Sequence, residues 1–311
     1  MISVIIPSYN EEKMISKTAS TIGKILENNS IDYELIFVND GSIDSTWNLI
    51  ENLSQQSDKI IGINFSRNFG KESAILAGLK YAKGDCCAVI DCDLQHPPIT
   101  LLDMYKKWQE GFEVIEGVKT ARGHENKLHT LCANCFYAIL TRITKLNMKN
   151  ASDYRLLDRK VVNAILMLPE KHFFFRALSS WIGYKHVTVE YAVNEREEGV
   201  SKWSFSSLIT YAVYNITSFT SIPLQLSTIM GIALGFISVI QGLHILLDIF
   251  KYHTISQYYV ILLLLLIVSS IILLCLGIIG HYIALIYEEV KDRPRFVIKE
   301  ICGGGNHEIT N

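Results

Sequence analysis

Charged residues are scarce in this chain of 311 residues, and their distribution is uneven. Asp, Glu, Lys and Arg make up 19% of the sequence, and the formal net charge is −2. This low charged fraction excludes a disordered polyelectrolyte and a nucleic-acid binder held by bulk positive charge. No charged residue occurs in residues 203–247 or in residues 252–287. The composition therefore predicts a polar front part and an apolar rear part that contacts a lipid bilayer.

Several motifs of nucleotide-using enzymes are also missing. No Gly-x-Gly-x-x-Gly follows an expected strand, which argues against a dinucleotide-dependent hydride transferase. Gly70-Lys71-Glu72 lacks the earlier glycine and the hydroxyl of a P-loop, and no Gly-x-Ser-x-Gly elbow occurs. The seven cysteines show no disulfide framework, and the first residues form a short apolar run without the basic region of a signal peptide. We therefore expect the front part to lie in the cytosol.

The rear part predicts helices in or on a membrane. Residues 226–250 and 258–282 are each long enough to span a bilayer, which takes about 20 apolar residues. Residues 203–224 place apolar residues at helical spacing among polar ones, which favours an amphipathic interfacial helix over an ordinary docked helix. The expected organisation is a cytosolic domain over residues 1–202, the interfacial helix over 203–224, two transmembrane helices within 225–290, and a cytosolic tail over 291–311.

The basic residues predict the orientation of this multi-pass protein. Lys291 and Arg293 follow the second apolar segment, Arg196 and Lys202 precede the first, and the loop between the segments offers only Lys251. The positive-inside rule therefore places both ends in the cytoplasm. Polar residues inside the first segment, at positions 241 and 244, indicate helix contacts between subunits and hence a homo-oligomer.

The front part alternates between strand and helix patterns. Expected strands cover residues 2–6, 34–38, 60–65, 86–90 and 113–116, and expected helices cover 11–27, 44–54, 71–82 and 97–110. This order predicts an α/β fold with a doubly wound, mostly parallel sheet.

Chemically capable residues follow each of the first four strands, where ligands bind in such sheets. They are Pro7, Tyr9 and Glu11 after the first strand, Asp40 after the second, Arg67 and Lys71 after the third, and Asp91, Asp93 and Gln95 after the fourth. Two carboxylates and an amide oxygen suit Mg²⁺ or Mn²⁺ on a nucleoside diphosphate, and the cations suit its phosphates. Arg122, in a polar stretch, is expected either in a loop that closes on the donor phosphates or in a plain solvated loop.

These segments resemble the family 2 glycosyltransferases of the GT-A fold. The matching segments are residues 4–12, 37–42, 66–72 and 90–98, and residues 152–159 and 196–203 resemble the polyprenyl-phosphate branch of that family. Bactoprenol glucosyltransferases and dolichol-phosphate mannose synthases belong to this branch. The Gln-x-x-Arg-Trp motif of processive polysaccharide synthases is missing, which argues against a polymerase.

The resemblance implies an inverting transfer of a sugar from UDP-glucose or another UDP-hexose to undecaprenyl phosphate at the cytoplasmic membrane face. The product would be a lipid-linked sugar for cell-envelope glycan modification. Alternatives are a GDP-mannose-dependent mannose synthase and a non-catalytic scaffold or flippase partner.

The resemblance also implies roles for individual residues. Asp40 would recognise the base, Asp153 would be the catalytic carboxylate, and Arg196 and Lys202 would face phosphates. A phosphate acceptor has a second pKa of about 6 and leaves little proton for a base to remove, so Asp153 is expected to orient groups instead. The alternative role for Asp153 is a helix N-cap.

Overall fold

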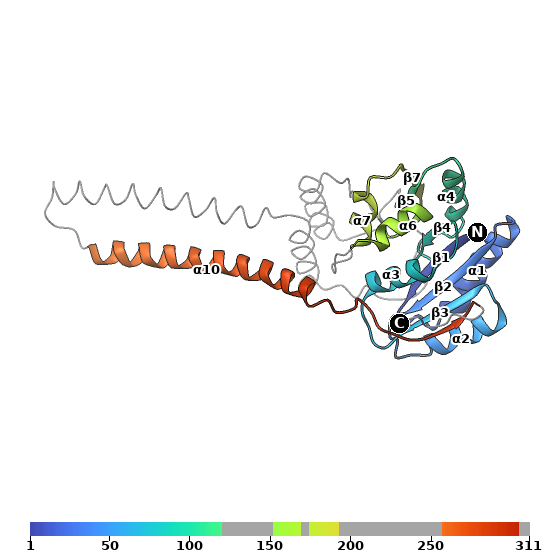
Figure 1. Cartoon of the computed structure of the whole chain (residues 1–311), viewed down its shortest axis with the longest axis horizontal. Helices are drawn as coiled ribbons and strands as arrows, with labels where there is room; N and C mark the ends of the chain where they lie inside the picture. Colours follow the sequence, from blue (N-terminus) through green and yellow to red (C-terminus); the bar gives the residue numbers. More distant parts are fainter. Residues whose placement is uncertain (120–151, 169–173, 193–256, 305–311) are drawn as a thin grey trace. The chain divides into compact units, whose positions relative to one another are not determined.

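The computed structural model describes residues 1–119, 152–168, 174–192 and 257–304 (Figure 1). The chain divides into two compact units, residues 1–202 together with 294–311, and residues 203–293. The predicted alternation of strands and helices in the front unit is confirmed. Its first nine elements are β1 (Ile2–Ser8), α1 (Ile15–Asn28), β2 (Tyr33–Asn39), α2 (Thr46–Gln56), β3 (Ile60–Phe65), α3 (Lys71–Tyr81), β4 (Cys86–Val89), α4 (Thr100–Gln109) and β5 (Val114–Lys119).

Five further elements complete the described part of the front unit, and the prediction contained none of them. They are β6 (Arg155–Asp158), α6 (Arg159–Leu166), α7 (Phe175–Trp181), β7 (His186–Tyr191) and β8 (Ile298–Gly303). All eight strands form one sheet in the order β7-β5-β6-β4-β1-β2-β3-β8.

The described sheet is mixed, and four of its seven strand pairings, including β5 with β7, are parallel, which agrees with the predicted mostly parallel sheet. Strands β1 to β4 run parallel to one another, as the helical crossovers between them require. Strand β6 is antiparallel to both β4 and β5, and β8 is antiparallel to β3. Mixed sheets of this kind are common where strands are added to a parallel centre.

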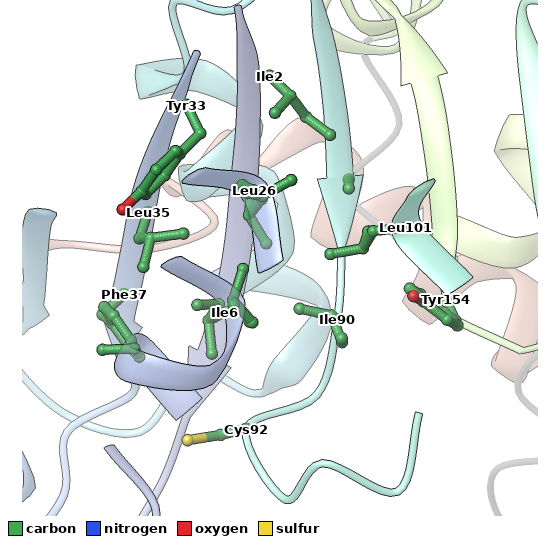
Figure 2. Close-up of a cluster of buried hydrophobic side chains, with 14 of the residues drawn as sticks. Ile2, Ile6, Leu26, Tyr33, Leu35, Phe37, Ile90, Cys92, Leu101 and Tyr154 are labelled. Atoms are coloured by element: carbon green, nitrogen blue, oxygen red, sulfur yellow. The ribbon is translucent and has the colours of Figure 1, made fainter. Parts of the chain in front are cut away.

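The core lies beside the parallel centre of the sheet. The side chains of Ile2, Ile6 and Phe37 are fully buried, and they pack with Leu26 of α1 in one cluster (Figure 2). Each such burial stabilises the fold by about 1.5–3 kcal/mol. Helix α1 buries residues at helical spacing from Ile15 to Leu26, which explains why it packs on the sheet. This packing fixes the carboxyl ends of the central strands.

The segment predicted as a cytosolic tail contains the edge strand β8. Ile301 pairs with Ile63 of β3 in the antiparallel register. The tail prediction was therefore wrong over residues 298–303, because a short strand on an edge shows no helix pattern and little alternation in sequence.

The rear unit contains one described helix, α10 (Gln257–Val290), of 34 residues. It covers the second predicted apolar segment. Among the residues that the structure describes, no helix combines the length and the apolarity that a bilayer crossing requires. The predicted interfacial helix, the first apolar segment and the polar positions 241 and 244 lie outside the described residues.

Candidate active site

The carboxyl ends of the parallel strands bring together residues that are far apart in sequence. Strands β1, β2 and β4 are neighbours in the sheet, so the segments that follow them meet at one edge. Asp40 follows β2 directly, Lys71 begins α3, and Asp91 comes two residues after β4. The chain from residue 152 adds Asp153 just before β6, beside β4.

Lys71 bridges two carboxylates at this edge. Its Nζ lies 2.6 Å from Oδ1 of Asp91 and 2.8 Å from Oδ2 of Asp153. Burial opposes the charge on Lys71, but Asp153 and Asp91 outweigh that cost and raise the pKa of the ammonium. Lys71 therefore remains positively charged over the physiological range. The sequence predicted that Lys71 neutralises phosphate, and a charged Lys71 at this edge of the sheet is compatible with that prediction.

Asp153 has a second cationic partner, Arg176. The guanidinium Nε donates to Oδ1 at 2.6 Å, and Nη2 donates to Oδ2 at 2.8 Å, so the pair is bidentate. Burial alone would raise the pKa of the buried Asp153 carboxyl, but Arg176 and Lys71 hold that pKa well below its usual range. Asp153 is therefore a fixed anion between two cations and a weak proton acceptor.

Asp153 does not cap a helix. It precedes strand β6, and the N-cap of α6 is Asp158, whose Oδ1 accepts a hydrogen bond from the Lys160 amide at 2.9 Å. The β5–β6 ladder places Asp153, since Ser152 Oγ donates to the Gly117 carbonyl at 2.7 Å. The N-cap alternative was therefore wrong.

Arg176 was missing from the predicted site, and a buried arginine holds it in place. Arg155 is 1% exposed, and it donates to the Arg176 carbonyl at 3.0 Å and to the hydroxyls of Ser179 and Ser180. Nη2 of Arg155 also forms an ion pair of 2.9 Å with Glu116. Arg155 thus fixes helix α7, on whose first turn Arg176 lies. The only sequence signal was an arginine after three phenylalanines, which has no distinctive spacing.

Glu72 connects helices α3 and α7 next to the ion pairs of Asp153. Its Oε2 accepts a hydrogen bond of 2.9 Å from the Phe175 amide, which ties the first turn of α3 to that of α7. Burial, together with the nearby charge of Asp153, raises the pKa of Glu72 to about 7. Neither the motifs nor the strand-end pattern predicted this contact.

The Asp40 carboxylate organises the loop before α3. Oδ1 accepts from the Phe69 amide at 2.6 Å, and Oδ2 accepts from the Gly70 amide at 2.9 Å. Burial raises the pKa of Asp40, while these two amides act in the opposite direction. In the structure Asp40 accepts hydrogen bonds from two backbone amides, and its contact with a base N–H stays a prediction.

The predicted metal ligands lie close in sequence after β4. Oδ1 of Asp93 accepts a hydrogen bond from the Gln95 amide at 3.1 Å, and Leu94 between them has φ of 54°. Asp91 and Asp93 supply carboxylate oxygens and Gln95 an amide oxygen, which is the ligand chemistry of a hard divalent cation. Among the described residues, no three His, Cys, Asp or Glu side chains cluster to hold a metal ion by themselves.

The remaining predicted residues fall into two groups. Pro7 and Tyr9 lie at the end of β1, the Glu11 amide donates to Thr46 Oγ1 at 2.9 Å, and Arg67 is exposed over the Phe69 ring at 4.4 Å. The other group, Arg122, Arg196 and Lys202, lies outside the described residues.

The mixed sheet, with the segments after its parallel strands gathered at one edge, has the GT-A fold. The structure of this protein is similar to that of glucosyl-3-phosphoglycerate synthase from Mycobacterium tuberculosis in complex with Mn²⁺, UDP and glucosyl-3-phosphoglycerate. The TM-score is 0.51 at 20% identity, over 68% of this chain and 76% of that chain.

Sequence comparison gives the family. The family model described as "Glycosyl transferase family 2" matches residues 3–166, and the chain belongs to this family. It is 38% identical to the uncharacterized glycosyltransferase YkcC of Bacillus subtilis (strain 168), over 99% of this chain and 96% of the relative. It is 34% identical to the bactoprenol glucosyl transferase of Shigella phage SfII, over 96% of this chain and 97% of that protein. The protein is therefore a glycosyltransferase, as the sequence predicted.

Proposed function

We propose that this enzyme transfers a hexose from a nucleotide sugar, UDP-glucose or another UDP-hexose, to undecaprenyl phosphate with inversion at the anomeric carbon. The observation that carries the proposal is the Lys71–Asp153–Arg176 cluster beside Asp91, at the edge where parallel sheets bind ligands. Near-full-length similarity to a bactoprenol glucosyl transferase supports a polyprenyl phosphate as the acceptor.

The chemistry of the site suits the departure of a nucleoside diphosphate. Asp91, Asp93 and Gln95 would hold Mg²⁺ or Mn²⁺, which supplies Lewis-acid stabilisation of the charge that develops on the leaving diphosphate. Phosphate oxygens of the donor would complete a ligand set that the protein supplies only in part. Lys71 and Arg176 add fixed positive charge near the same edge, and such preorganised charge stabilises a developing anion.

Asp153 would hold cations and would not remove a proton. The acceptor is a phosphate monoester with a second pKa of about 6, so most of it is already a dianion at neutral pH. A carboxylate between Lys71 and Arg176, with its pKa held low, has little basicity to offer. Its contacts hold the side chains of Lys71 and Arg176 in place, and in the proposed reaction these cations would face the reacting phosphates.

We infer further that the enzyme is a multi-pass membrane protein with its catalytic domain in the cytoplasm. Although no described helix qualifies as a membrane span, residues 252–287 contain no charged residue. Large apolar side chains are exposed at several described positions along α10, among them Ile261, Leu276 and Tyr287. Large exposed apolar surfaces of this kind favour a lipid environment or a protein partner. A membrane location would bring the lipid acceptor to the site.

A membrane assay tests the proposed reaction. Membranes containing the enzyme receive undecaprenyl phosphate, Mg²⁺ or Mn²⁺, and one radiolabelled UDP- or GDP-sugar at a time. We expect a lipid-linked product from a UDP-hexose, loss of product with EDTA, and a fall in kcat/KM of about a hundredfold or more for Asp93→Asn. Product from GDP-mannose alone would select the mannose synthase. No lipid-linked product from any donor would refute the transfer.

A separate labelling experiment tests the orientation. Single cysteines at positions 254 and 308, in a chain without its native cysteines, are exposed to a membrane-impermeant maleimide in intact cells. We expect labelling at position 254 only, because the positive-inside rule puts both chain ends in the cytoplasm. Labelling at position 308 in intact cells would contradict this orientation.

A further inference from the structure

The C-terminal strand β8 continues a row of polar side chains across the sheet. Asn39 of β2 is the register partner of Asn64 of β3, and Asn64 is the register partner of Glu300 of β8. Cross-strand partners project their side chains from the same face of a sheet. The row therefore runs from the edge strand to the residue that immediately precedes Asp40.

Hydrogen bonds join the members of this row. Asn64 Nδ2 donates to Glu300 Oε1 at 2.6 Å, and Asn39 Nδ2 donates to Asn64 Oδ1 at 2.7 Å. Asn39 Oδ1 in turn accepts from the Ser42 amide at 3.3 Å. Asn39 is 1% exposed and Asn64 is 5% exposed. Because an unpaired buried amide is costly, the Glu300 carboxylate sets the orientation of both amides.

The row ends on the loops that carry predicted donor-binding residues. Ser42 Oγ accepts a hydrogen bond from the Asn10 amide at 2.9 Å, and Asn10 Oδ1 accepts from the Ile43 amide at 3.0 Å. Asn10 has φ of 54°, a backbone state that needs such local support. The loops after β1 and β2 are thus fastened to each other and, through Asn39, to the edge strand.

The same C-terminal segment also supports the loop after β3. The Ser66 amide donates to the Val297 carbonyl at 3.0 Å, and the Phe296 ring stacks on the Phe65 ring with centroids 5.2 Å apart. This loop continues to Phe69, whose amide binds Asp40. Two separate sets of contacts therefore lead from residues 296–300 to the surroundings of Asp40.

We propose that Glu300 is a positioning residue for the nucleoside diphosphate donor, acting through Asn64 and Asn39 on the loop at Asp40. The chain segment that follows the apolar helix α10 is then part of the donor site. This inference depends on the proposed function, because it assumes that the loops after β1, β2 and β3 bind the nucleotide. A purely structural β8 would stabilise the sheet without changing nucleotide affinity.

Nucleotide binding by the full-length protein in detergent distinguishes these roles. The probe is UDP with Mg²⁺, and equilibrium binding gives Kd without any acceptor. We expect Glu300→Ala to raise the Kd of UDP about three- to tenfold, the range of one lost hydrogen bond. Glu300→Gln keeps an acceptor oxygen for Asn64 and is expected to bind within about twofold of wild type. Lys299→Ala, on the same strand, is the control: its exposed ammonium lies 3.7 Å from the same Glu300 oxygen, and the loss of this exposed ion pair leaves the acceptor for Asn64 in place and is expected to change Kd by less than about twofold.

Steady-state kinetics provides the second measurement. For Glu300→Ala we expect KM for the nucleotide sugar to rise with little change in kcat, since the reacting groups are untouched. If Glu300→Ala does not fold, Asn64→Ser interrupts the same row from β3 and carries the same expectation. Folded variants of both residues with wild-type Kd would overturn the inference while leaving the transfer reaction standing. Wild-type protein that binds UDP but forms no lipid-linked sugar would refute the proposed acceptor, and the Kd comparison would still decide the role of Glu300.

Discussion

Replacing Arg176 with alanine removes one of two cations that neutralise a buried carboxylate. Breaking a buried ion pair costs about 3–5 kcal/mol, because the remaining charge loses its partner. The cost is smaller here, since Lys71 still contacts Asp153 and the Arg176 side chain is 24% exposed. We therefore expect a loss of about 1–2 kcal/mol at pH 7, which lowers the melting temperature by roughly 3–6 °C.

The pH dependence of this loss separates it from ordinary packing effects. The folded-state pKa of Asp153 is depressed, so its stabilisation is present above the unfolded pKa and is lost only as pH falls through the lower folded pKa. Without Arg176, only Lys71 opposes the effect of burial, so the Asp153 pKa rises and protonation relieves the less compensated charge at a higher pH. The melting difference between wild type and Arg176→Ala should therefore shrink as pH falls from 7 to 5.

The assay is thermal unfolding of the purified full-length protein at pH 7 and pH 5, with transfer activity measured in parallel. Arg159→Ala is the matched control, because the Arg159 Nε donates to the Gly84 carbonyl at 2.8 Å, next to the amino end of β4. We expect the control to lower stability equally at both pH values and to retain kcat. We expect Arg176→Ala to lower kcat/KM at least tenfold, about the effect of losing one charged contact to a transition state. An Arg176→Ala variant with wild-type activity and a pH-independent melting difference would refute the role of the ion pair.

Two further predictions concern neighbouring residues. Glu72 has a pKa of about 7, above its unfolded value, so the folded state binds the extra proton and wild-type stability should fall as pH rises from 5 to 8. The variant Glu72→Gln should flatten this dependence of stability on pH and should melt roughly 2–5 °C higher than wild type at pH 8. An unchanged pH dependence in thermal unfolding would contradict the raised pKa of Glu72. Gly41 has φ of 65°, and a Cβ there would lie 2.6 Å from the backbone nitrogen of Asn68. Gly41→Ala should therefore displace the loop beside Asp40 and weaken UDP binding about tenfold or more. Wild-type affinity of this variant in equilibrium binding would show that the loop is not part of the donor site.

The sequence by itself determined the fold class and several of the residues that the structure brings together at one edge of the sheet. Strong apolar runs separated by helix patterns identify β1 to β4 with their helices, since both periodicities are local. Polar residues after those strands, among them Asp40, Lys71 and Asp91, could be found because parallel strands bring their carboxyl ends to one edge. The lack of charge over residues 252–287 likewise required no coordinates.

Only the tertiary structure decided which charges meet. Arg176 pairs with Asp153 because Arg155, buried on β6, holds helix α7 at that place, and no local pattern encodes this contact between distant segments. The contact of Glu300 could not be predicted from local sequence either. Glu300 belongs to a segment expected as a tail, and its hydrogen-bond partner Asn64 lies 236 positions earlier in the sequence. Periodicity reports which face of an element is buried, whereas the partner of a charged side chain depends on how the elements pack.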